Sequence, residues 1–216
     1  MKKWYVTVIA LLILTWILAA VTLMLLPDTI PVHYNAAGEV DRIGSKYEQL
    51  ILPVFLTVLS VAFLFVVEKK EIFGEKRSLI LTCIVMQTVL LAVFVYLSVS
   101  ALRYNGGTSL ALPLDVWRFA AILFGVLLAT VGLLLKDVPR NRFLGLRTKW
   151  SLSSDTAWKK SQHFAGVSGI VVGCLILLLV CFLKEVAVMI AVCALLVLWC
   201  VLGVVASYRY AKKENG

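Results

Sequence analysis

Six long blocks of apolar residues, each about as long as a bilayer is thick, constrain this chain most. They cover residues 4–26, 50–67, 78–102, 116–135, 164–183 and 186–208, and Arg118 is the only charged residue inside them. A helix needs about 20 mostly apolar residues to cross the hydrocarbon core, where only helices and closed barrels satisfy the backbone. The blocks are longer than barrel strands and do not alternate. The sequence therefore predicts an all-α polytopic membrane protein with about six transmembrane helices.

The distribution of positive charge predicts the orientation of these helices. The chain is 62% hydrophobic and only 15% charged, with a formal net charge of +9. Sixteen of the 21 Lys and Arg residues fall in alternate segments, namely the N-terminus, 69–77, 136–160 and the tail. Cytoplasmic loops carry an excess of Lys and Arg. We therefore expect both termini to be cytoplasmic, the lipid bilayer to be the partner of the apolar surface, and no direct nucleic-acid partner.

Two polar segments are long enough to hold structure, and they divide the expected architecture. An outer loop, residues 27–49, belongs to an N-terminal two-helix unit (1–77). An inner segment, residues 136–163, belongs to a C-terminal four-helix unit (78–216). Small residues four or seven apart let membrane helices approach closely. Ala165, Gly169 and Gly173 on one helix, with Gly125 and Gly132 on another, predict that the last three helices pack together.

The outer loop reads LPDTIPVHYNAAGEVDRIGSK and has the pattern of a short hairpin. Apolar and other residues alternate up to Tyr34, and a turn signal ending at Gly38 follows. His33 could be a pH switch or a metal ligand. The other histidine, His163, is expected across the membrane, and no cluster has metal-ligand spacing. We therefore expect a solvated or hydrogen-bonded His33 and no metal.

The inner segment predicts an irregular loop followed by a helix. Ser153 or Ser154 can cap that helix, which we expect to run along the membrane interface and to turn into the next spanning helix near Gly166. Trp150 and Trp158 suit the interfacial aromatic belt. A docking surface for a cytoplasmic partner and a simple membrane-hugging connector both remain possible from composition.

Catalysis and transport receive little support from the residues. Asp155 and His163 are eight positions apart, about 12 Å along a helix, which is too far for a hydrolytic triad, and no HExxH, GxSxG or P-loop occurs. We expect no enzyme and no cofactor. Transport paths usually carry ionisable residues inside spans, whereas Gln87 is most simply an interhelical hydrogen bond. A small transporter or channel, or an accessory subunit of another membrane protein, is the alternative function.

Two passages together resemble a known family. The outer loop resembles a widespread N-terminal domain of uncharacterised function in bacterial membrane proteins, and its matching positions include Pro27, Pro31, His33, Asn35, Gly38, Asp41, Gly44, Ser45 and Lys46. The passage NRFLGLRTKWSLSSDTAW resembles the motif of the SdpI immunity proteins at Asn141, Gly145, Arg147, Thr148, Trp150, Leu152 and Trp158. The chain departs from the family pattern at Lys149, where proline is usual, and at the triplet Ser161-Gln162-His163, where Thr-His-Arg is usual.

The resemblance implies a protein of the bacterial cytoplasmic membrane. It implies protection of the cell from a secreted antimicrobial peptide toxin, met on the outer side. It also implies a signalling partner, a small cytoplasmic transcriptional repressor that is held at the inner side. The departure at the Ser161-Gln162-His163 triplet bears on whether this member works as its relatives do.

Overall fold

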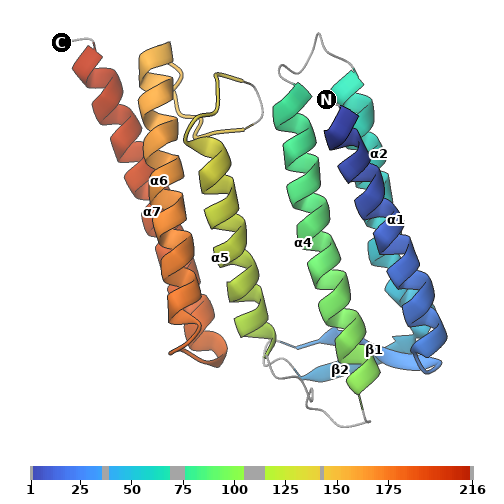
Figure 1. Ribbon diagram of the computed structural model, residues 1–216. Coiled ribbons are helices and arrows are strands. Elements are labelled where there is room, and N and C mark those ends of the chain that lie inside the picture. Colours follow the sequence, from blue (N-terminus) through green and yellow to red (C-terminus); the bar gives the residue numbers. More distant parts are fainter. Residues whose placement is uncertain (1, 36–38, 69–75, 105–114, 142–143, 215–216) are drawn as a thin grey trace. The chain divides into compact units, whose positions relative to one another are not determined.

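Six long helices make up most of the part of the chain that the structure describes. The computed structural model describes residues 2–35, 39–68, 76–104, 115–141 and 144–214. Each of the six helices is long and apolar enough to cross a membrane, which confirms the predicted all-α polytopic fold. The helices, labelled in Figure 1, are α1 (Lys2–Leu25), α2 (Ile51–Glu68), α4 (Lys76–Arg103), α5 (Val116–Leu135), α6 (Asp155–Leu179) and α7 (Glu185–Glu214).

The helices form two compact units, Met1–Asp115 and Val116–Gly216. The boundary therefore lies one helix later than the one expected after residue 77, because α4 packs with α1 and α2. A buried amide explains this grouping. Gln87 on α4 donates from Nε2 to the Ser60 Oγ of α2 at 2.8 Å and to the Val8 carbonyl of α1 at 3.3 Å. The expected interhelical hydrogen bond of Gln87 is thus confirmed, and it joins three helices.

The predicted hairpin is present in the first unit. Strands β1 (Thr29–Tyr34) and β2 (Val40–Ser45) pair antiparallel, from Thr29 opposite Ser45 to Tyr34 opposite Val40. Ile30 of β1 is buried with Leu26 and Ala101, so the hairpin is packed onto the ends of α1 and α4. The 3-10 helix η1 (Lys46–Leu50) then leads into α2.

Glycines bring α5 and α6 into backbone contact in the second unit. A Cβ on Gly132 would lie 2.6 Å from the Gly166 carbonyl oxygen, and one on Gly173 would lie 2.6 Å from that of Gly125. Gly169 is nearest the Trp199 ring of α7, and the Ala165 carbonyl accepts a hydrogen bond from Trp199 Nε1 at 3.2 Å. The close packing of these three helices is confirmed.

One expectation about α6 is wrong. Among the residues described before it, 136–141 and 144–154, there is no separate interfacial helix, and α6 runs continuously from Asp155 to Leu179 without a turn near Gly166. Gly166 serves a different purpose: a Cβ there would lie 2.5 Å from the Lys136 backbone nitrogen at the end of α5. The small residue permits close approach of two helices rather than a bend. Ser154 is the N-cap, and its side chain accepts from the Ala157 N–H.

Candidate functional site

The described residues of the outer motif hold the hairpin together. His33 Nδ1 lies 2.6 Å from Asp41 Oδ1 across the two strands, which agrees with a hydrogen-bonded His33. Asn35 Oδ1 accepts from the Glu39 N–H, and Asn35 Nδ2 donates to Glu39 Oε2, both at 3.0 Å. Pro31 is buried in β1. Gly38 lies outside the described residues.

The end of the hairpin is fixed by a capping box. Ser45 caps η1, and Glu48 returns a carboxylate oxygen to the Ser45 N–H at 3.2 Å. A Cβ on Gly44 would lie 2.0 Å from Glu48 Oε1, so only glycine leaves room for this carboxylate. Lys46 Nζ pairs with Asp28 Oδ1 at 2.9 Å and ties η1 to the end of α1. Gly44, Ser45 and Lys46 of the motif therefore have structural roles: space for a carboxylate, the cap of η1 and an ion pair to the end of α1.

A hollow of about 220 Å³ lies between this hairpin and the helices α2 and α4, and we call it the outer groove. Arg42 and Glu48, which pair at 2.9 Å, supply its charged lining. Burial raises the pKa of the Tyr34 phenol above its ordinary value near 10, so this group stays protonated. Sequence reasoning missed the groove because it forms only where α4, which is distant in the chain, packs beside the hairpin and the start of α2. Its lining is mostly apolar and includes Ile30, Pro31, Val32, Tyr34, Ile51, Leu52, Phe94 and Leu97.

The α5–α6 loop, residues 136–154, carries most of the inner motif and is held against α6. The Gln162 side chain binds both backbone groups of Leu146: Oε1 accepts from its N–H at 2.8 Å, and Nε2 donates to its carbonyl at 3.0 Å. Gly145 has φ +134°, and a Cβ there would lie 2.7 Å from Gln162 Oε1 and 2.9 Å from the Trp158 ring. The glycine is required by backbone conformation and by space.

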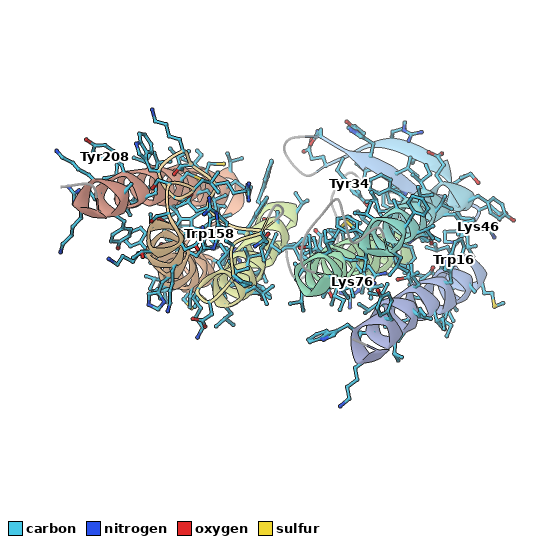
Figure 2. All side chains as sticks on the ribbon, turned by 90° about the horizontal axis from the view of Figure 1, so that it is seen from above. Trp16, Tyr34, Lys46, Lys76, Trp158 and Tyr208 are labelled. Atoms are coloured by element: carbon cyan, nitrogen blue, oxygen red, sulfur yellow. The ribbon has the colours of Figure 1, made fainter. Side chains whose placement is uncertain are left out.

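Trp158 is a core residue of the second unit rather than an interfacial anchor. Its side chain is only 2% exposed, and its Nε1 donates to the Val138 carbonyl at 3.1 Å. Figure 2 shows it inside the second unit, next to the α5–α6 loop. The expectation of a membrane-belt position for Trp158 is therefore wrong, because a buried carbonyl of the loop satisfies the indole N–H.

Other motif residues fasten the loop to itself and to α7. Thr148 and Ser151 exchange backbone-to-side-chain hydrogen bonds at 2.9 Å, and Thr148 Oγ1 lies 2.8 Å from Ser207 Oγ of α7. The ring of Trp150 meets that of Tyr208 edge-on, with centroids 5.3 Å apart.

Two polar side chains shape the loop surface. Asn141 is buried, and its amide accepts from the Leu144 N–H at 2.7 Å and donates to its carbonyl at 3.0 Å. Arg147 donates to the Asn141 carbonyl and places its guanidinium 5.9 Å from the centre of the Trp158 ring. Because the Arg147 side chain remains exposed, it is available to a partner from solution.

His163 stands apart from the rest of the inner motif. Its side chain is exposed and lines a separate hollow with other residues of α6, with the start of the α5–α6 loop and with Tyr210 of α7. Sequence reasoning did not select Arg140, which donates to Asp155 at 3.0 Å and to the Leu152 carbonyl at 2.7 Å. It also did not select Gln162. The one signal for Gln162 in the sequence was that the triplet Ser161-Gln162-His163 departs from the family pattern.

Comparison with known proteins identifies both passages. Residues 137–207 match the SdpI/YfhL protein family, and residues 10–57 match a domain of unknown function, DUF1648. The chain is 26% identical to the "Immunity protein SdpI" of Bacillus subtilis (strain 168) over 216 residues, 100% of this chain and 99% of the relative. It is 40% identical over 53 residues to an uncharacterized protein of Archaeoglobus fulgidus, covering 24% of this chain and 29% of that protein. No solved structure matches.

Proposed function

Because this chain is a membrane protein of the SdpI/YfhL family, we propose that it is an immunity protein, which protects its host cell from a secreted antimicrobial peptide toxin. The similarity to the immunity protein of Bacillus subtilis extends over the whole of both chains. It therefore includes the outer hairpin as well as the inner loop, and both are parts that such a role uses.

The proposed orientation places the hairpin outside the cell and the α5–α6 loop inside. Three spanning helices, α2, α4 and α5, separate the two segments in the chain. An odd number of crossings puts them on opposite sides of the bilayer. The excess of Lys and Arg in the α5–α6 loop and the tail assigns that side to the cytoplasm. Six crossings then leave both termini in the cytoplasm.

The outer groove is the proposed place where the toxin is met. Its walls are apolar and it carries one ion pair, Arg42 with Glu48, which suits an amphipathic peptide. The hairpin beside it is fixed by the capping box and by the Lys46–Asp28 pair. A rigid groove loses little conformational entropy when it binds a ligand.

The α5–α6 loop is the proposed docking surface for a cytoplasmic partner, a small transcriptional repressor. The observation that carries this part is the pair of hydrogen bonds from Gln162 to Leu146, which fixes an otherwise irregular loop in one conformation. The loop then presents the exposed side chains of Arg147 and Lys149 to the cytoplasm. A connector with no partner has no need for such a defined surface.

The test is a challenge of a gene-deletion strain with the peptides that its own species secretes. We expect the deletion to sensitise cells to at least one peptide and the wild-type gene to restore resistance. Ile51 lines the groove and is 67% exposed, so Ile51→Trp should fill its mouth and reduce protection. Ile43→Trp is the matched control, because Ile43 is 51% exposed and does not line the groove.

The outcomes separate the parts of the proposal. Unchanged survival of the deletion strain against every peptide would overturn the immunity role. Full protection by Ile51→Trp, at wild-type protein levels in the membrane, would overturn the groove alone. A fluorescently tagged repressor that stays in the cytoplasm during toxin exposure would overturn the relay alone.

A further inference from the structure

A basic hollow of about 390 Å³ lies at the inner end of the second unit, away from the motif contacts of the α5–α6 loop. Four of its residues, Thr156, Lys159, Lys160 and His163, come from one face of α6 at the spacing of successive helical turns. Lys136 and Asp137 follow the last residue of α5, and Tyr210 belongs to α7. Two helices, α6 and α7, and the first residues of the α5–α6 loop therefore build this site together.

The charge of the hollow selects an anion. Three lysines face a single acid, Asp137, whose side chain is 75% exposed and lies 3.8 Å from Lys136 Nζ. Within the part of the chain that the structure describes, Lys159 and Lys160 form no ion pair. Ammonium groups around a hollow with a phenol beside them offer donors to a phosphate group.

The surface of α6 next to the hollow is apolar, which favours an anion that carries acyl chains. Below His163, the same face of α6 continues with the exposed apolar side chains Val167, Val171 and Leu178. From Val167 to Leu178 the helix rises about 16 Å, at about 1.5 Å per residue. One leaflet of the hydrocarbon core is about 15 Å thick, half of about 30 Å. The apolar track therefore has the length of one leaflet and begins where the charged residues end.

We propose that this hollow is a binding site for a single anionic phospholipid of the inner leaflet. The phosphate lies among Lys136, Lys159 and Lys160, and the acyl chains lie along Val167, Val171 and Leu178. A bound lipid would contact the residues after α5, the start of α6 and Tyr210 of α7 at once, and so would stabilise the α5–α6 loop. This site does not depend on the immunity role.

The test measures the thermal unfolding midpoint of the full-length protein in detergent micelles during titration with three probes. These are phosphatidylglycerol, phosphatidylcholine and inorganic phosphate. We expect phosphatidylglycerol to raise the midpoint at concentrations at least about tenfold lower than phosphatidylcholine does. Each lysine near a charged surface favours an anionic lipid by about fivefold, and three lysines line the hollow. Inorganic phosphate, which has no chains, should leave the midpoint unchanged at equal concentration.

The variant Lys136→Gln/Lys159→Gln/Lys160→Gln should bind phosphatidylglycerol about 100-fold more weakly, because it loses a factor of about five for each of the three lysines. The control Arg209→Gln/Lys212→Gln/Lys213→Gln removes the same charge from α7 outside the hollow and should lose less than about threefold. Equal losses in the two variants would show diffuse surface attraction and would overturn the site. A shift with inorganic phosphate equal to that with phosphatidylglycerol would overturn the lipid assignment, and an unchanged affinity of the first variant would overturn both.

Discussion

Replacement of Gln162 by alanine should release the α5–α6 loop from α6 while the rest of the fold persists. The variant removes both hydrogen bonds to Leu146 and leaves its N–H partly buried without a protein partner, whereas the Leu146 carbonyl keeps the hydrogen bond that Ser151 Oγ donates at 2.7 Å. A typical net hydrogen bond contributes about 1 kcal/mol, and an unsatisfied buried group costs about 1–3 kcal/mol. The loop should therefore lose about 2–4 kcal/mol of local stability.

Hydrogen exchange of the full-length protein in lipid nanodiscs measures this loss. A loss of 2 kcal/mol accelerates exchange of the Leu146 amide about 30-fold, since about 1.4 kcal/mol corresponds to a factor of ten. Gln87→Ala is the matched control, because Gln87 also makes two side-chain hydrogen bonds but lies in the first unit. It should leave exchange in the loop unchanged. Equal exchange of the loop in Gln162→Ala and wild type would refute the reasoning.

Four further predictions follow from individual contacts. Gly132→Val should separate α5 from α6 and prevent recovery of folded protein, because even a Cβ would lie 2.6 Å from the Gly166 carbonyl; Gly203→Ala, whose Cβ would lie 3.3 Å from a flexible Leu146 methyl, should purify normally. Trp158→Phe should lower the free energy of unfolding by about 1–3 kcal/mol through the orphaned Val138 carbonyl, as measured by thermal unfolding in detergent. Gly44→Ala should displace the Glu48 carboxylate and speed proteolysis at the hairpin, and resistance equal to wild type would argue against the capping box. Arg147→Ala should reduce toxin protection more than His33→Ala, since Arg147 supports the Trp158 face of the loop whereas the His33 pair with Asp41 is exposed; the reverse order of survival would contradict this.

Local patterns predicted the parts of the fold that depend on local physics. The spanning helices follow from the length and hydropathy of each block, because the bilayer imposes both. The hairpin follows from alternation and turn residues around Tyr34. The contact of α5 with α6 follows from the spacing of Gly125 and Gly132, because small residues at helical spacing mark close packing in membranes.

Contacts between distant residues could not be read in this way. Trp158 has the same amphipathic chemistry in a membrane belt as in a core, and the Val138 carbonyl that decides between them is 20 residues away. The helix α4 joins the first unit through Gln87, whose partner carbonyl at Val8 is 79 residues away. Gln162 was visible only as a departure from a family pattern, since its role depends on the folded path of Leu146.

The most direct test of the account is the sidedness of its two polar surfaces. Single cysteines at Ile43 in β2 and at Thr156 at the start of α6, both exposed, can be placed in a background whose five native cysteines are replaced. A membrane-impermeant maleimide added to intact cells should label position 43 and reach position 156 only after the cells are opened. Labelling of both positions from the same side would contradict the arrangement on which the proposed protection and relay depend.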